Sequence, residues 1–183
     1  MLQQMLLQMS CLQRLILPIT DLTRSMPKVK AVVAGGKSRQ ESVNLGLNAL
    51  SDKVKLAAIQ DGARPLITWQ VIDRVVRAAH THGAAIPCVP VKDTIKVGNG
   101  GIVKETPDRA TLFAAQTPQV FDFDLLRGAL KKAELDDYAV TDDASAVEYM
   151  GMNVKIVEGD ERNIKVTTPM DLKIAEMLLE EMQ

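Results

Sequence analysis

Short apolar segments alternate with amphipathic segments along most of this sequence of 183 residues. Five runs rich in Val, Ile, Leu and Ala resemble strands that are buried on both faces: residues 12–19, 29–34, 54–60, 84–91 and 153–158. A repeated strand, helix, strand order requires right-handed crossovers and places helices on both faces of a mostly parallel sheet. The sequence therefore predicts an α/β, doubly wound fold in a single domain over residues 1–183.

Three helical segments separate or follow these runs. Residues 38–50 begin with Ser38 and Glu41 in the S-x-x-E pattern of a capping box. Residues 68–79 repeat Val, Ile and Ala at helical spacing, and residues 167–182 begin with a Thr cap followed by Pro. We expect helices in all three places.

One segment interrupts the alternation. Residues 94–105 contain two short β-type runs around Gly98-Asn99-Gly100-Gly101, whose residues tolerate positive φ. The segment predicts a protruding hairpin. It is either a surface loop or an arm that reaches another subunit, because an isolated two-stranded hairpin is only marginally stable in water.

Composition excludes several classes of partner. With 22 Lys and Arg against 23 Asp and Glu, the chain has no basic footprint for nucleic acid. No apolar run is long enough to span a membrane, and the first residues lack a signal-peptide pattern, so we expect a cytoplasmic protein without a membrane partner. Cys11 and Cys88 are expected to be packing residues, and the spacing of His80 and His82 does not favour metal binding.

A charged cluster follows the run at residues 54–60, where Asp61, Gly62 and Arg64 occur together. Ligands of open parallel sheets bind at the carboxyl ends of the strands. Asp61 could hold Mg²⁺ together with substrate phosphates, Gly62 could admit a ligand to the backbone, and Arg64 could pair with an anion. The alternative is a structural salt bridge in a turn.

Polar residues also follow other predicted strands, which suggests a pocket for a substrate rich in phosphate. A glycine loop that runs into a helix start favours an anionic ligand. Acidic residues at a helix start are more often plain caps. The clusters are residues 35–38, residues 92–94, residues 141–143 and Lys165.

Six ordered motifs carry a family resemblance: "AGGKSRQESVNLGL", "DGARP", "PVKDTIK", "DRATLFAAQTPQVF", "TDDASAVEYMG" and "VEGDERNIKVTTPMDL". Over residues 1–182 the chain resembles the 2-C-methyl-D-erythritol 4-phosphate cytidylyltransferases. The resemblance implies a Rossmann-like nucleotidyltransferase that joins CTP to methylerythritol 4-phosphate and releases pyrophosphate, in the non-mevalonate route to isoprenoid precursors. It also implies Mg²⁺ as cofactor and a homodimer.

The resemblance assigns roles on the nucleotide side of the pocket. Gly36, Lys37 and Ser42 match contacts to cytosine and ribose, although an acidic residue is common in the family at the position of Lys37. Asp61, with Gly62 beside it, matches the aspartate that binds metal and nucleotide.

On the other side of the pocket, Thr94, Thr141 and Lys165 match contacts around the sugar phosphate and the reacting α-phosphate. Arg109 and Thr117 match groups that the neighbouring subunit places on the sugar phosphate. They would be carried by a dimerisation arm at residues 94–117, called the arm below.

The implied mechanism is direct attack of the substrate phosphate oxygen on the α-phosphorus of CTP. Such chemistry depends on positioning and on cations placed where negative charge accumulates. Arg109 and Lys165 would orient the incoming phosphate, and Asp61 would hold the metal; these three are the expected catalytic residues. Arg64 is the further expected substrate-binding residue.

The chain departs from the family pattern at its start. Members begin with a strand and a glycine-rich loop bearing Arg and Lys, whereas the first residues here resemble the helix and second strand that follow. Two interpretations stay open: an active enzyme whose sequence continues further at the N-terminus, or a truncated domain that dimerises and binds ligand without catalysing. A ribitol 5-phosphate type of cytidylyltransferase is a third, although "DGARP" is nearer the methylerythritol type.

Overall fold

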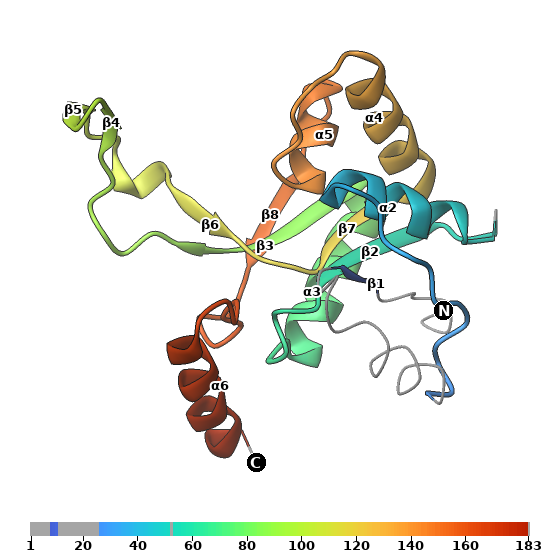
Figure 1. Ribbon diagram of the computed structural model, residues 1–183, viewed down its shortest axis with the longest axis horizontal. Coiled ribbons are helices and arrows are strands. Elements are labelled where there is room, and N and C mark those ends of the chain that lie inside the picture. The colour runs from blue at the N-terminus through green and yellow to red at the C-terminus, as the bar shows by residue number, and fades with distance from the viewer. Residues whose placement is uncertain (1–7, 11–25, 52, 183) are drawn as a thin grey trace.

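A six-stranded sheet forms the centre of the molecule (Figure 1). The computed structural model describes residues 8–10, 26–51 and 53–182. The sheet runs in the order β1, β2, β7, β3, β6, and β8 pairs with the remaining edge of β3. The strands are β1 (Gln8–Ser10), β2 (Leu56–Asp61), β3 (Ala84–Pro90), β6 (Phe113–Ala115), β7 (Gln119–Asp122) and β8 (Lys155–Glu158).

Most of the sheet runs in one direction, as predicted. β1 pairs parallel with β2, and β3 pairs parallel with β8. β7 lies between β2 and β3 and is antiparallel to both, and β6 is antiparallel to β3. β2 and β3 therefore share a direction, and their carboxyl ends lie at one edge of the sheet, beside the first residues of β7.

Helices cover both faces of this sheet, as the doubly wound class requires. Alternate residues of β2 point to opposite faces: Ala57 and Ile59 join one apolar cluster, whereas Ala58 joins the other. The first cluster contains residues of α2 (Arg39–Asn48), α4 (Phe123–Leu135) and α5 (Asp143–Tyr149). The second is closed by α3 (Trp69–His82).

The predicted helices are confirmed. Ser38 caps α2 by accepting a hydrogen bond from the Glu41 N–H, but the Glu41 carboxylate accepts from the Lys37 N–H, so the predicted reciprocal capping box is not formed. α3 extends three residues beyond the predicted end. α6 (Pro169–Glu181) begins with a capping box made by Thr168 and Asp171.

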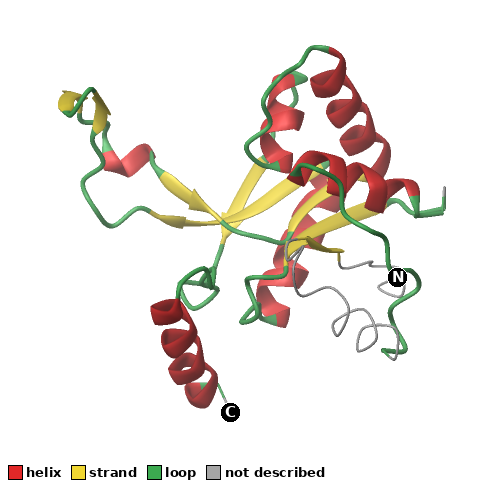
Figure 2. Ribbon diagram, viewed as in Figure 1, coloured by secondary structure: helices red, strands yellow, loops and turns green. Residues whose placement is uncertain are grey.

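The arm leaves the body as a long excursion between β3 and β7 (Figures 1 and 2). It contains the hairpin β4 (Val97–Asn99) and β5 (Ile102–Glu105), the short 3-10 turn Arg109–Thr111, and β6. Gly100 and Gly101 both have positive φ in the turn, as the sequence predicts. The hairpin pairs as a separate two-stranded sheet and protrudes from the body.

One predicted strand is wrong. Residues 29–34 form no strand with any described part of the chain, and Val32 and Val33 are about 40% exposed (38% and 42%). A short apolar run satisfies the composition of a strand, but a strand also needs a neighbour to pair with, and composition does not supply one. The predicted strand at residues 12–19 and Cys11 lie outside the described residues.

Two further expectations can be compared with the structure. Cys88 lies in the larger apolar cluster with 4% of its surface exposed, as expected of a packing residue. In the part of the chain that the structure describes, no helix combines the length and apolarity needed to cross a bilayer.

Candidate active site

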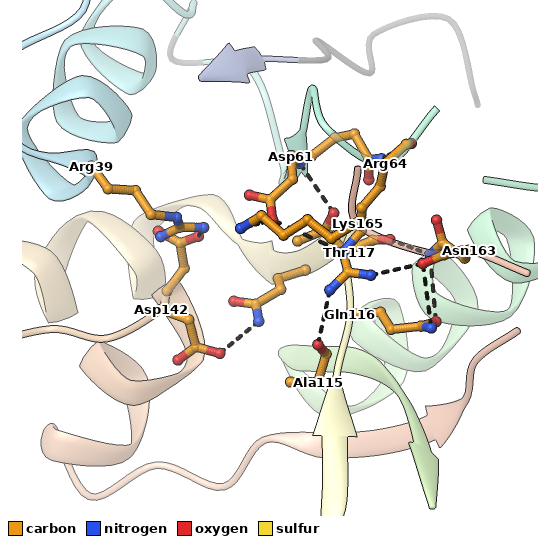
Figure 3. A network of polar contacts seen from close by, with 12 residues as sticks. Arg39, Asp61, Arg64, Ala115, Gln116, Thr117, Asp142, Asn163 and Lys165 are labelled. Carbon is orange, nitrogen blue, oxygen red and sulfur yellow. Dashed lines mark hydrogen bonds and ion pairs between the residues drawn. The ribbon is translucent and has the colours of Figure 1, made fainter. Parts of the chain in front are cut away.

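Asp61 is the centre of a polar cluster at the carboxyl end of β2 (Figure 3). Its Oδ2 lies 3.0 Å from Lys165 Nζ and 3.9 Å from Arg64 Nε. Its N–H donates to Thr117 Oγ1 at 3.0 Å. Three segments that are distant in sequence thus meet at one strand end, where the open-sheet rule expects a ligand.

The turn after β2 fixes the geometry of this cluster. The Arg64 N–H donates to the Asp61 carbonyl at 3.0 Å, and Gln60 Nε2 donates to the Arg64 carbonyl at 3.0 Å. Asp61 is therefore held by the strand on one side and by a hydrogen-bonded turn on the other. Its carboxylate therefore lies at the carboxyl end of β2 with little conformational freedom.

Arg64 has a partly structural role. Its Nη1 donates to the Asn163 carbonyl at 2.7 Å, and its Nη2 approaches the Ala115 carbonyl at 3.3 Å. Burial lowers the pKa of Arg64, although the Asp61 charge opposes this. The guanidinium thus links the turn after β2 to the end of β6 and to the loop before α6, and the turn salt bridge considered from the sequence is present at long range.

Lys165 combines a fixed position with an accessible amine. Its side chain is 49% exposed while it faces Asp61. The next residue, Val166, donates its N–H to the Ala63 carbonyl at 2.8 Å, which ties the loop before α6 to the loop after β2. An ammonium held beside a carboxylate and open to solvent can receive an anionic group.

The glycine loop lies at the start of α2. The Gly36 N–H donates to Ser42 Oγ at 3.0 Å, and that hydroxyl donates to the Ser38 carbonyl at 2.8 Å. Lys37 is exposed. Gly36, Lys37 and Ser42 therefore lie together at one helix start.

Arg39, which had no assigned role, leads from α2 toward the cluster (Figure 3). Its Nη2 lies 2.5 Å from Asp143 Oδ2, and Asp143 is fully buried. Burial opposes the charge of Arg39, but the hydrogen bond to Asp143 and the charges of Asp143, Asp61 and Asp142 raise its pKa overall. Burial also raises the pKa of Asp143. Arg39 therefore ties the start of α2 to the start of α5 through Asp143.

The other expected site residues divide into two groups. Thr117, at the end of the arm, is buried, with 4% exposed, and its hydroxyl accepts the Asp61 N–H of its own chain. Thr94 and Arg109 are exposed at the base of the arm, where Arg109 Nη1 donates to the Lys92 carbonyl at 2.6 Å. No contact between these two and Asp61 occurs in the described chain.

The segment at residues 141–143 behaves mainly as a helix start. Asp142 caps α5 by accepting from the Ser145 N–H at 2.9 Å, which confirms the cap interpretation. Asp142 Oδ2 also accepts from Gln119 Nε2 at 2.7 Å. Thr141 is exposed, and its N–H donates to Ser145 Oγ at 3.1 Å.

Two buried carboxamides, Gln116 and Asn163, were not identified from the sequence. Gln116 lies immediately before Thr117, and Asn163 lies two residues before Lys165. Their only sequence signal is their position beside predicted site residues, because Gln and Asn are also common on surfaces.

The cluster offers a single carboxylate to a metal ion. Among the described residues, no group of three or more His, Cys, Asp and Glu side chains comes together. Mg²⁺ usually takes only one or two protein carboxylates and completes its coordination with phosphates and water. Asp61, with 13% of its side chain exposed, is compatible with that donor set.

The fold and this cluster define the class: a Rossmann-like α/β nucleotidyltransferase. The family model described as "IspD: 2-C-methyl-D-erythritol 4-phosphate cytidylyltransferase" matches residues 7–181. The chain belongs to this family, as the sequence motifs predict.

Individual relatives agree with the family model. The chain is 48% identical over 161 residues to the 2-C-methyl-D-erythritol 4-phosphate cytidylyltransferase of Symbiobacterium thermophilum, covering 87% of this chain and 68% of that protein. It is 46% identical to the enzyme of the same name from Syntrophus aciditrophicus, covering 84% of this chain and 66% of that protein. The chain thus spans about two thirds of the length of the curated relatives it matches.

Solved structures give the same result. The 4-diphosphocytidyl-2C-methyl-D-erythritol synthase of Anaerococcus prevotii superposes with a TM-score of 0.82 at 31% identity, covering 89% of this chain and 76% of the other. The 2-C-methyl-D-erythritol 4-phosphate cytidylyltransferase of Thermus thermophilus gives 0.73 at 38% identity, covering 80% and 71%.

Proposed function

We propose that this chain transfers a cytidylyl group from CTP to 2-C-methyl-D-erythritol 4-phosphate, with release of pyrophosphate. One observation carries the proposal: in a chain of this family, Lys165 and Asp61 meet at 3.0 Å while half of the lysine side chain remains exposed. A cation beside a carboxylate suits a reaction in which one phosphate attacks another, because negative charge must be neutralised at the point of attack.

The described residues supply the proposed binding functions from separate elements. Gly36, Lys37 and Ser42 at the start of α2 would contact the cytosine and ribose, with Gly62 admitting the nucleotide to the backbone. Lys165 would orient the attacking phosphate of the alcohol toward the α-phosphorus of CTP. Holding the two reactants in line provides much of the acceleration in such reactions, because it replaces a random encounter with a fixed geometry.

Asp61 would hold Mg²⁺ together with phosphate oxygens of the nucleotide. When bound, the ion neutralises phosphate charge. Asp61 would keep its contact with Lys165, and the Thr117 hydroxyl would keep the Asp61 backbone in place. Arg64 would add positive charge on the side of the alcohol phosphate, where Thr141 would contact the sugar phosphate or the reacting α-phosphate.

We also propose that the arm forms a homodimer and places Thr94 and Arg109 on the substrate of the neighbouring subunit. Ile102 and Val103 at the tip of the arm are 63% and 58% exposed. Exposed β-branched residues on a two-stranded hairpin are more stable when another surface covers them. Both proposed substrates carry phosphates that do not cross membranes freely, so we place the reaction in the cytoplasm, without nucleic acid or membrane partners.

The transfer proposal is tested by an assay of pyrophosphate release from CTP, with Mg²⁺ and either methylerythritol 4-phosphate or ribitol 5-phosphate. We expect turnover with the first alcohol, strongly reduced turnover with the second, and loss of turnover when EDTA removes the metal. Preference for ribitol 5-phosphate would replace the proposed substrate. CTP binding in a calorimeter without turnover on either alcohol would show a ligand-binding domain that does not catalyse.

The dimer proposal is tested by light scattering after size-exclusion chromatography. We expect the Ile102→Ser/Val103→Ser variant to shift from dimer to monomer, because the change removes apolar area from the tip of the arm. Met170→Ser is the matched control, since Met170 is also 63% exposed but lies on α6. A wild-type monomer, or dissociation caused by the control alone, would exclude dimerisation through the arm.

A further inference from the structure

The side chain of Gln116 binds the main chain of the loop that carries Lys165 (Figure 3). Gln116 Nε2 donates to the Asp160 carbonyl at 2.8 Å, and Gln116 Oε1 accepts from the Asp160 N–H at 3.2 Å. The carboxamide therefore bonds both main-chain groups of one residue, as a neighbouring strand would. Gln116 is 5% exposed, so these bonds are shielded from competing water.

Asn163 completes the connection from within the same loop. Its Nδ2 donates to the Thr117 carbonyl at 3.0 Å and lies 3.4 Å from Gln116 Oε1. Its own carbonyl accepts from Arg64 Nη1 at 2.7 Å. One fully buried residue thus links the Lys165 loop to Thr117, two residues before β7, and to the turn after β2.

Apolar packing does little to hold this loop. Asn163 is the only buried residue within residues 159–168, all of which the structure describes. The helix that follows, α6, buries Ala175 but leaves Met170 and Met177 more than 60% exposed (63% and 65%). The position of Lys165 therefore depends mainly on hydrogen bonds.

The arrangement has the character of a positioning device. A buried carboxamide pair adds little net stability, since each group gives up bonds to water, and Asn163 Oδ1 is buried without a partner in the described chain. Directional bonds nevertheless fix both the distance and the angle between the groups that they join. Small displacements of a group that orients substrate lower the rate strongly.

We infer that Gln116 and Asn163 are positioning residues, which hold the loop at residues 159–166 so that Lys165 stays at Asp61. The inference rests on the proposed cytidylyl transfer for its effect on rate. Its structural part, the restraint of the loop, does not depend on that reaction and can be measured separately.

The test uses Gln116→Met, which keeps the shape of the side chain and removes its hydrogen bonds. Gln119→Met is the matched control: Gln119 is also buried, at 2% exposed, and its Oε1 accepts from a main-chain N–H, that of Ala144. Hydrogen exchange measured by mass spectrometry should increase over residues 159–166 in Gln116→Met. In Gln119→Met it should increase near Ala144 instead.

Activity is measured in the same variants with and without Lys165→Ala. We expect Gln116→Met to lower kcat roughly 10- to 100-fold with a smaller change in the KM for CTP, and to have no further effect when Lys165 is already Ala. Gln119→Met should lower activity by the same factor in both backgrounds. If Gln116 were purely structural, Gln116→Met would also lower activity by the same factor with Lys165 and with Lys165→Ala.

The possible outcomes separate the two proposals. A wild-type chain without turnover would reject the proposed function, while the exchange data would still decide on the restraint of the loop. Unchanged exchange over residues 159–166 in Gln116→Met would overturn the inference. Equal rate factors in the two Lys165 backgrounds, in an active enzyme, would also overturn it.

Discussion

Arg39 Nη2 lies 2.5 Å from Asp143 Oδ2, and the two partners differ strongly in their access to solvent. The Asp143 side chain is fully buried, whereas 32% of the Arg39 side chain is exposed. Removing either partner leaves the other charge unpaired, and the consequence depends on which partner is removed. An unpaired arginine can still reach water, but an unpaired aspartate at this position cannot.

The first prediction follows from this asymmetry. Arg39→Ala should destabilise the protein by about 3–5 kcal/mol, because it leaves a buried carboxylate uncompensated. Asp143→Ala should cost less, about 1–3 kcal/mol, since Arg39 can turn toward solvent. Urea unfolding of the two single variants and of the double variant measures these values. A double variant as destabilised as the sum of both would show that the pair does not interact.

The second prediction concerns the pH dependence of Arg39→Ala. Burial raises the pKa of Asp143, and without Arg39 nothing opposes that effect. A group whose folded-state pKa is raised contributes stability below its unfolded pKa, about 4 for Asp, and loses it as the pH rises through the folded value. The variant should therefore be closer to wild type at pH 5 than at pH 8. A difference in the free energy of unfolding between Arg39→Ala and wild type that stays the same from pH 5 to pH 8 would contradict this.

The third prediction concerns catalysis by the proposed reaction. Lys165→Ala should leave the far-ultraviolet circular dichroism and the melting temperature near wild type, because half of the side chain is exposed. It should lower kcat by about 100-fold or more, as expected when a cation at a developing charge is lost. The control is Lys132→Ala on α4, which removes an exposed ion pair to Asp136. Near-normal turnover of Lys165→Ala in a steady-state assay would reject the role.

The fourth prediction compares two glycines. A Cβ on Gly159 would lie 2.5 Å from Gln116 Oε1 and 3.1 Å from the Cys88 carbonyl, so Gly159→Ala must displace the loop that carries Lys165. A Cβ on Gly128, in α4, would meet Met150 at an ordinary 4.0 Å. Gly128→Ala should raise stability by about 0.5–1 kcal/mol, as Ala does within helices.

Thermal unfolding and turnover measure both glycine variants. We expect Gly159→Ala to lose stability and most of its activity, whereas Gly128→Ala keeps its activity. Full activity of Gly159→Ala would show that the loop adapts without disturbing Lys165.

The fifth prediction concerns Cys88. Burial raises the pKa of its thiol to about 11, so the reactive thiolate is scarce at neutral pH. Iodoacetamide at pH 8 should leave Cys88 unmodified in the folded protein and modify it fully in urea, as measured by peptide mass spectrometry. Rapid modification of the folded protein would show that the surrounding core opens easily.

The elements predicted well are those with clear local boundaries in the sequence. β2, β3 and β8 arise from apolar runs bounded by turn residues, and α6 carries a complete set of start signals in Thr168, Pro169 and Asp171. The run at residues 29–34 looks equally apolar, yet it forms no strand among the described residues. Pairing depends on what lies beside a segment in space, which periodicity alone does not contain.

β7 and α4 were not predicted from the sequence, and the absence of β7 affected the prediction of the site. β7 runs opposite to β2, so its beginning, not its end, lies at the functional edge. Thr117, which precedes β7, therefore reaches Asp61 of its own chain at the point where the arm rejoins the sheet. Strand ends can be found from the sequence, but strand direction within a sheet requires the topology.

Two of the residues missed at the site share one property. Gln116 and Asn163 are polar and buried, and each acts through a partner far away in the sequence. Asp61, Arg64 and Lys165 were found because they follow strands in recognisable motifs. A single sequence does not contain the distances between these buried residues and Asp61, Arg64 and Lys165.

The C-terminal segment is attached weakly, so the elements that stabilise this chain are not the ones that carry its proposed activity. The two apolar clusters draw on α2, α3, α4, α5 and the sheet, whereas Lys165 lies on a loop before a helix that buries one small residue. Partial opening could release that loop while the rest of the molecule stays folded. Heating or mild denaturant should then abolish turnover before any spectroscopic sign of melting appears.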